Sequence, residues 1–537
     1  MKRYISILTI FAVVLIFGFN TSCETLEVEN KNLPDMERVL NTPEDVKQVV
    51  GGAFQAYWDA IKTYNIGMTA DVAADHSTAS WGNFAWQDMS WEPRQAWNND
   101  PAYGEASLSE DVYYGLNAVI SQVSDPIVLI QDGMEIGPGG EDNQMILATA
   151  HLIRGLSFGQ IGLSFDKAMI PRVEEAEEAS VYLANLEFQP WNVVIEEAIV
   201  ELEKAIEIAD ANEFAWPEST VPGVTLSNTY ISQLASSYAA RFLALGARTK
   251  AQNDDMSWTD KYSWADVLTF TNNGITADFA PTGNGLPWNG GSWYDLNIKY
   301  LRQPGWGRVD IRIISMMDSE QPVRYPTDDA GLPTAELPPN AGEAVNAVDG
   351  RIDTDFQYLA SNNFNGARGA WHFSHYRHSR YDDPPTTSSE GYGMGESIGP
   401  LFELRVYDNE LMKAEAMVRA NSDYAGAAGI LNDAANPRKA RGGLDDVDAA
   451  EEDVLNAIYY ERLIELFHNG YLIAFCETRR NDDLQYGTPL HFPVPGKELM
   501  ALQMDLYTYG GVDNADGENT STGGDWIKDE YHFDPSW

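Results

Sequence analysis

With 537 residues, 44% of them hydrophobic, the chain has enough apolar material for a large core. Its 81 acidic and 35 basic residues give a formal net charge of −46. A surface that acidic repels phosphate backbones, so nucleic acid is not expected as a partner. It also excludes docking onto anionic lipid through a basic patch.

The first residues predict an exported lipoprotein. Lys2 and Arg3 precede an apolar run over residues 5–19 that is too short to span a bilayer comfortably. The run ends in Asn-Thr-Ser before Cys23, which resembles a lipobox, although Asn20 stands where Leu is usual. We expect residues 1–22 to be a cleaved signal peptide, Cys23 to carry lipid, and residues 23–42 to form a tether. The alternative is an ordinary secretory signal followed by a chance cysteine.

A helix is predicted to begin after Thr42. Thr42 is a suitable N-cap, Pro43 suits the first helical position, and Asp45 stands where a capping box needs an acid. Apolar residues then recur at helical spacing at Val46, Val50, Ala53, Tyr57 and Ile61.

Four further helices are predicted from the same periodicity, over residues 190–210, 230–249, 401–420 and 451–470. Gly470 is expected to close the last of them. Residues 274–400 are rich in Gly, Pro, Asn and aromatics and predict loops and short elements, as does the tail beyond Pro493. The sequence therefore indicates a mostly α protein. It has a helical scaffold at about 43–270 and 401–470, an elaboration at about 271–400, and C-terminal loops at 471–537.

Several segments, taken together, resemble the SusD/RagB family of nutrient-binding lipoproteins. The pair NVVIEEAIVELEKAI (192–206) and SYAARFLALGART (237–249) resembles the family's central helices. In the segment 403–420, the positions that match the family's helix are Arg405, Leu411, Ala414, Glu415 and Ala416, whereas Asn409 departs from its usual acid. The turn at 430–444, the helix at 460–470 (with Asn469 in place of an acid) and HFPVP at 491–495 also match.

The resemblance implies a single SusD-like domain at 43–537, built on four tetratricopeptide-like helix hairpins, from a bacterium of the phylum Bacteroidota. It implies anchoring to the outer membrane by lipid, with the protein facing the exterior. It further implies a SusC-like TonB-dependent transporter as partner, and capture of glycans or, in some members, peptides. The match is weakest around residues 80–180 and 280–400.

Tryptophan placement gives the clearest signal for a binding site. One Asn-rich stretch contains Trp81, Trp86, Trp91 and Trp97, and a second cluster consists of Trp288, Trp293, Tyr294 and Trp306. Flat rings stack on the apolar faces of sugars, while polar side chains bind the hydroxyl edges. We therefore expect ligand contacts from both clusters, except Trp91, and from Asp75, Asn83 and Arg302. The alternative is that these tryptophans are core residues.

Other chemistry is not expected. His372, His375 and His378 lie close in sequence, but Arg377 and Arg380 would repel a metal ion. Cys476, in an apolar run, is expected to be buried, and no hydrolase, zinc-protease or nucleotide-binding motif is present. We expect no cofactor and no enzymatic activity. The favoured ligand is a glycan, such as a neutral β-glucan; a peptide-binding importer subunit and a secreted glycoside hydrolase are the alternatives.

Overall fold

A computed structural model describes residues 40, 42–79, 83–91, 93–175, 179–303, 305–323, 342–360, 374–382 and 397–523. The signal peptide, Cys23, Trp81 and His372 lie outside the described residues, so those predictions are not tested here.

Helices dominate the described chain, as predicted. They are α3 (Pro43–Lys62), α4 (Ile66–Ala73), α5 (Trp86–Ser90), α6 (Ser107–Gln131), α7 (Asn143–Ser164), α8 (Ala179–Ala184), α9 (Trp191–Ala211), α10 (Asn228–Leu245), α11 (Lys250–Asp255), α12 (Trp264–Asn272), α13 (Leu296–Leu301), α14 (Ile311–Met317), α15 (Arg351–Thr354), α16 (Val406–Asn421), α17 (Tyr424–Leu431), α18 (Pro437–Ala440), α19 (Glu451–Ile464), α20 (Ile473–Arg480) and α21 (Gly496–Ala501). Short 3-10 turns are η1 (Asn83–Ala85), η2 (Pro138–Gly140), η3 (Val173–Glu175), η4 (Pro287–Asn289) and η7 (Val512–Asn514).

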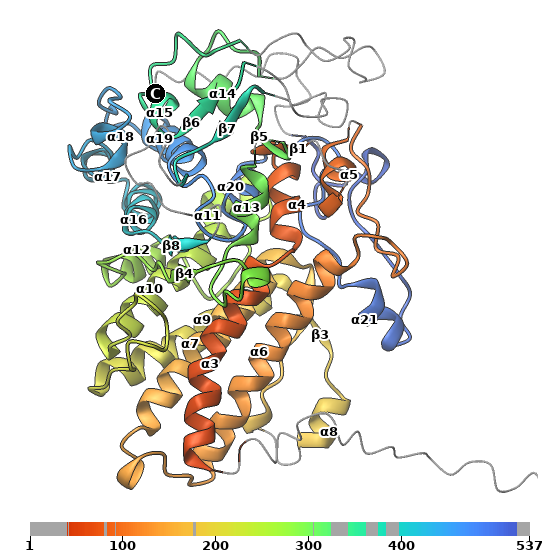
Figure 1. The fold of residues 1–537 in the computed structure, drawn as a ribbon, viewed down its shortest axis with the longest axis vertical. Coiled ribbons are helices and arrows are strands. Elements are labelled where there is room, and N and C mark those ends of the chain that lie inside the picture. The colour runs from red at the N-terminus through yellow and green to blue at the C-terminus, as the bar shows by residue number, and fades with distance from the viewer. Residues whose placement is uncertain are drawn as a thin grey trace, which may run out of the picture.

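The long helices stack in chain order. α3 packs on α6, α6 on α7, α7 on α9, α9 on α10, α10 on α12 and α12 on α16, while α16 and α19 both contact α17 (Figure 1). Each long helix thus buries its apolar face against the preceding and following helices of the stack, which is the arrangement of stacked helix hairpins. The mostly α architecture expected from the sequence is confirmed.

The start of α3 is as predicted. The Thr42 hydroxyl accepts a hydrogen bond from the Asp45 backbone N–H, and the Asp45 carboxylate accepts one from the Thr42 N–H at 3.1 Å, so the capping box is complete. All five periodic apolar residues predicted for this helix are buried.

Three predicted helix boundaries are wrong. α10 ends at Leu245 rather than at residue 249. α16 begins at Val406 rather than at residue 401, because Leu404 forms a β-bridge with Phe279 in an extended segment before it. α19 ends at Ile464, so Gly470 does not close it. Gly470 instead takes a left-handed conformation, φ 83°, in the turn that leads to α20.

Strands are short and pair only in twos in the described chain. They are β1 (Ser77–Ala79) with β5 (Gly307–Val309), β2 (Lys167–Met169) with β3 (Phe188–Pro190), β4 (Thr282–Asn284) with β8 (Ile398–Pro400), and β6 (Phe356–Tyr358) with β7 (Tyr376–His378). All four pairs are antiparallel. The pairing of Ser77 with Val309 matters most, because it brings the two tryptophan-rich stretches of the sequence together.

Charged side chains buried inside the helical scaffold form ion pairs. Arg480 donates to both carboxylates Glu415 and Glu477, and Arg462 bridges the same two acids. All four side chains are buried, so each charge is compensated by hydrogen-bonded partners. Several of the charged residues behind the family resemblance therefore stabilise the fold rather than meet a ligand.

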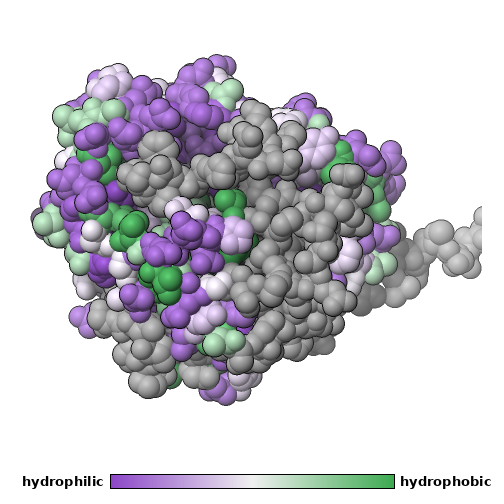
Figure 2. Space-filling model, turned by 90° about the horizontal axis from the view of Figure 1, so that it is seen from above, coloured by the Kyte–Doolittle hydropathy of each residue, from purple (hydrophilic) through white to green (hydrophobic). Residues whose placement is uncertain are grey.

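The described surface is polar. Seen from the end that carries α14 and α15, hydrophilic residues predominate and apolar residues form separated patches (Figure 2). Among the described residues, no helix combines the length and the apolar character that crossing a membrane requires.

Candidate ligand-binding site

An aromatic cluster lies where α4, η1, α13 and β5 meet. We define it as Tyr64, Phe84, Tyr300 and Trp306. The rings of Tyr64 and Phe84 stack with centroids 5.4 Å apart, and Tyr300 contacts both, at 5.6 Å from Tyr64 and 5.2 Å from Phe84. Trp306 lies parallel to Tyr300 at 4.6 Å. Residues far apart in sequence thus form one continuous aromatic surface.

The cluster is backed by core and partly open. Tyr64, Phe84 and Trp306 are half-buried, whereas Tyr300 is only 8% exposed. They pack against a small apolar core, which consists of Met68, Val72, Trp86, Leu286, Leu296 and Leu301. Because the rings are fixed from behind and partly exposed, they can offer apolar area to a ligand with little further loss of side-chain entropy.

Phe84 is held in a conformation that it would not adopt freely. Both Phe84 and Ala85 have left-handed backbone angles, φ 60° and 52°, which non-glycine residues rarely occupy. The Glu105 carboxylate accepts a hydrogen bond from the Phe84 N–H at 2.9 Å. The Thr69 hydroxyl donates to the Phe84 carbonyl at 2.8 Å. Such strain persists where surrounding contacts over-determine it, and it is common at ligand sites.

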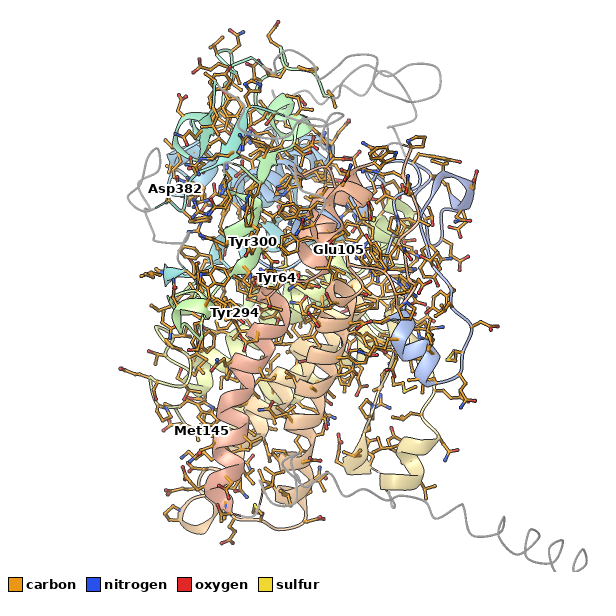
Figure 3. The ribbon with its side chains drawn as sticks, turned by 45° about the vertical axis from the view of Figure 1, so that its right-hand side comes forward. Tyr64, Glu105, Met145, Tyr294, Tyr300 and Asp382 are labelled. Carbon is orange, nitrogen blue, oxygen red and sulfur yellow. The ribbon has the colours of Figure 1, made fainter. Side chains whose placement is uncertain are left out.

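Tyr294 lies beside the cluster. Its carbonyl accepts a hydrogen bond from the Trp58 indole at 2.6 Å, and its half-buried side chain packs against the same small core. Figure 3 shows Tyr64, Tyr294 and Tyr300 close together, with Glu105 to one side. Burial raises the pKa of Asp59 to about 6, although a hydrogen bond with Tyr294 opposes the rise.

Trp288 stands at the tip of a closed loop. The Asn284 side-chain oxygen accepts hydrogen bonds from the backbone N–H groups of Ser292 and Trp293, at 2.8 and 2.9 Å, which fastens the base of the loop. Trp288, in η4 at the far end, is 53% exposed. An indole exposed at the tip of a fastened loop leaves ring area open to a ligand.

Three of the predicted stacking residues lie in the core instead. Trp86, Trp97 and Trp293 are 0, 2 and 5% exposed. Trp97 packs edge-on against Phe492 at 5.1 Å, and Trp293 lies 5.6 Å from Trp58. These three indoles present no open ring face in this structure, so they stabilise packing.

The predicted polar ligands are also differently placed. Asp75 is 1% exposed and forms a 2.6 Å ion pair with Arg94. Arg302 is 6% exposed and forms an ion pair with Asp382, which also forms an ion pair with Arg377. Asn83 alone among the predicted polar ligands is exposed, at the start of η1.

The structure therefore brings together Phe84, Tyr294 and Trp306 from the two predicted regions. Asn83 directly precedes Phe84 in the chain, and Trp288 lies on the loop that precedes α13. Tyr64, Phe84 and Tyr300 were not predicted as site residues, because the two predicted clusters were defined by the density of tryptophan in the sequence. Tyr64 lies between Thr63, which caps the end of α3, and Asn65, which caps the start of α4, and this turn leaves its ring half-buried.

Residues with other chemistry do not form a site. Cys476 is fully buried, and burial raises the pKa of its thiol, which disfavours the reactive thiolate. His375 and His378 are described, but within the described ranges no cluster of His, Cys, Asp and Glu has the geometry to hold a metal ion.

Comparison with known proteins identifies the fold. No protein-family model and no curated protein matches the sequence. A SusD superfamily protein from Parabacteroides distasonis is similar in structure, with a TM-score of 0.59, 12% identity, and coverage of 87% of this chain and 99% of that one. A SusD homolog from Bacteroides thetaiotaomicron has a TM-score of 0.56 and 13% identity, with coverage of 87% of this chain and 98% of that one. A SusD-like carbohydrate binding protein from Bacteroides vulgatus has a TM-score of 0.51 and 16% identity, with coverage of 83% of this chain and 86% of that one. Together with the stacked helix hairpins, these similarities show that the chain has the SusD-like fold.

Proposed function

We propose that this protein is a surface lipoprotein that captures oligo- or polysaccharide and passes it to a TonB-dependent transporter. The observation that carries the proposal is the partly exposed aromatic cluster, together with the exposed Trp288 on the loop that precedes α13. Rings that are fixed from behind and open in front suit the apolar faces of sugars, and a strongly acidic chain favours a ligand without negative charge. A neutral glycan, such as a β-glucan, meets both conditions.

Two further observations support it. One structural neighbour is described as carbohydrate binding, and this chain covers 86% of its length. The N-terminal sequence, with its short apolar run and Cys23, fits export and lipidation. A lipid-anchored capture protein outside the cell needs a membrane partner that completes the import, which is the role that the family resemblance assigns to the transporter.

Binding is tested by native affinity electrophoresis against a panel of neutral polysaccharides. We expect at least one to retard the parent protein, and Trp288→Ala to be retarded much less. The matched control is Tyr486→Ala, because Tyr486 is also an exposed aromatic, at 41%, but lies outside the cluster. If no glycan retards the parent, or if both variants behave like it, the proposal fails.

Two more measurements separate the alternatives. Oligosaccharide incubated with the protein should be recovered intact, whereas shortened products would indicate a glycoside hydrolase. Gentle detergent extraction of the outer membrane should co-purify a large β-barrel protein. Repeated elution of the lipoprotein alone would contradict the transporter partnership.

A further inference from the structure

A cavity of about 600 Å³ lies apart from the aromatic cluster. We call it the Trp191 cavity. It opens between β2, β3, the start of α9, the segment that joins α10 to α11, and the C-terminal segment around residue 509. Its wall includes the cations Lys167 and Arg248, the carboxylates Asp166 and Glu518, and the rings of Trp191 and Tyr509. None of its lining residues belongs to the aromatic cluster. In Figure 1, β3 lies well below β1, β5 and α13 along the long axis.

Hydrogen bonds hold the wall of the cavity in place. The buried Asp166 carboxylate accepts from the hydroxyls of Tyr507, at 2.9 Å, and Tyr509, at 3.1 Å. The Asp166 carbonyl accepts from the Trp191 N–H at 2.9 Å. The C-terminal segment is thereby fixed against β2 and α9. The volume is in the range of small-molecule sites, which are about 300–1,000 Å³.

The cavity wall contains a buried arginine that has no carboxylate in hydrogen-bond contact. Arg248 is 1% exposed, and its guanidinium donates to the carbonyls of Gly162 and Gly246, at 2.6 and 2.9 Å. It also donates to His491 Nδ1 at 3.3 Å and lies 4.1 Å from the Trp191 ring centre. Every one of these acceptors is neutral, because burial lowers the pKa of His491 well below its usual value.

Arg479 adds a second charge behind Arg248. It is fully buried and donates to the carbonyls of Leu163, Leu245 and Leu490, at 2.9–3.0 Å. Burial lowers the pKa of both guanidinium groups, and repulsion from Arg479 lowers that of Arg248 further. In the described chain neither arginine forms an ion pair, whereas the buried Arg154, Arg241 and Arg480 all bind carboxylates.

Two donors at the cavity are available to a ligand. Lys167 Nζ lies over the rings of Phe188 and Tyr507, at 5.3 and 4.5 Å, and forms no ion pair within the described residues. The Gln252 side-chain oxygen accepts from the Arg248 N–H at 2.9 Å, which directs its amide nitrogen away from that bond. The half-buried Trp191 and Tyr509 supply ring area beside them. Burying Arg248 and Arg479 without an ion pair is costly. Asp166 offsets part of this cost for Arg248, and an anion in the cavity would offset more of it.

We propose that the Trp191 cavity is a second binding site, which takes a sugar residue that carries a carboxylate. The carboxylate would pair with Lys167 in the field of Arg248, and the sugar ring would lie against Trp191 or Tyr509. The site does not depend on the function proposed for the aromatic cluster. It would allow the protein to hold a polysaccharide that contains both neutral and acidic units.

Ligand-observed NMR titration with sodium D-glucuronate tests this site. Glucose serves as the neutral sugar and acetate as the anion without a ring. We expect glucuronate to bind more tightly than either, and Lys167→Gln to weaken it about tenfold, as loss of a charged hydrogen bond does. The control is Lys261→Gln, because Lys261 is 58% exposed and does not line the cavity. Lys167 is half-buried without an ion pair, so its replacement should leave the fold intact.

Each outcome decides the proposal. If glucose binds as tightly as glucuronate, the site does not recognise the carboxylate; if acetate does, the site does not recognise the sugar ring. Either result overturns the assignment. So does an absence of glucuronate binding, or an unchanged glucuronate affinity in Lys167→Gln. Trp288→Ala should bind glucuronate like the parent. If Trp288→Ala instead abolishes binding, glucuronate occupies the aromatic cluster, and the Trp191 cavity is not the site.

Discussion

Tyr300 and Trp306 lie parallel, with ring centroids 4.6 Å apart and an interplanar angle of 1°. Tyr300 belongs to α13 and is almost covered, whereas Trp306 precedes β5 and is half-buried. The covered ring therefore orients the more exposed one. Because β5 pairs with β1, the position of Trp306 also depends on the segment that leads to η1 and Phe84.

This relationship predicts a large effect of Trp306 on glycan binding. Trp306→Ala should weaken binding by about tenfold or more, since a central stacking residue behaves as a hot spot. Trp306→Phe should keep part of the affinity, because it retains a ring on Tyr300. Calorimetric titration with a glycan that the parent binds provides the measurement. Equal affinities for parent and Trp306→Ala would remove Trp306 from the site.

Glu105 is predicted to act as a positioning residue for Phe84. Glu105→Ala removes the acceptor of the Phe84 N–H and should let the left-handed turn at Phe84 and Ala85 relax. Glycan affinity should then fall several-fold, while Glu105→Gln, which keeps an oxygen acceptor, should restore most of it. A purely structural role would instead lower the melting temperature in Glu105→Ala without changing the affinity of the folded protein.

The local parts of this fold could be predicted from the sequence, because their causes lie within one helix. The cap at Thr42 and the apolar spacing of α3 and α9 involve neighbours along the chain. Burial of Trp97 could not be predicted, since it depends on Phe492 at the other end of the sequence. The same applies to Arg302, whose partner Asp382 lies in another loop.

The two regions that form the aromatic cluster could be predicted from the sequence, but not the residues on its open side. Both tryptophan-rich stretches do meet, through the pairing of β1 with β5, yet the residues on the open side include tyrosine and phenylalanine. Composition marks aromatic density, whereas exposure is set by the long-range packing that covers one ring and leaves the next open. The Trp191 cavity gave no sequence signal, because Lys167, Arg248 and Tyr509 lie far apart in the chain and only the fold brings them together.

Acid should destabilise the protein through Glu465. Arg380, Arg441 and Arg351 surround this buried carboxylate and lower its pKa from 4.5 to about 2. A pKa that is lower in the folded state stabilises the fold above pH 4.5, and this stabilisation is lost as the pH falls from 4.5 to 2. The free energy of unfolding, measured in urea at a series of pH values, should decrease across that range.

The variant Glu465→Gln tests this assignment. It should cost about 3–5 kcal/mol at neutral pH, because it leaves buried arginines short of a partner. It should also flatten the decrease of stability below pH 4.5. The control is the exposed Glu452→Gln, which should change neither quantity. An unchanged acid dependence in Glu465→Gln would show that other groups control acid unfolding.

Membrane attachment is predicted to depend on Cys23. Cys23→Ala should give a protein that no longer partitions into the membrane fraction, because only the acyl chains would anchor so acidic a molecule. Mass spectrometry of the parent should find the mature chain beginning at Cys23 with added lipid. Unchanged partitioning of Cys23→Ala would contradict lipidation.

The last prediction separates core tryptophans from binding tryptophans. Trp97 is 2% exposed and packs against Tyr103 and Phe492, so Trp97→Ala should leave a cavity and cost about 3–5 kcal/mol of stability. The fraction that stays folded should bind glycan like the parent. Trp288, which is 53% exposed, should show the reverse: Trp288→Ala should change the free energy of unfolding by less than about 1 kcal/mol and weaken binding. Urea denaturation and calorimetric titration on the same preparations measure both quantities. Because stability and affinity would move independently in the two variants, a parallel loss of both in Trp97→Ala would place that side chain in the site after all.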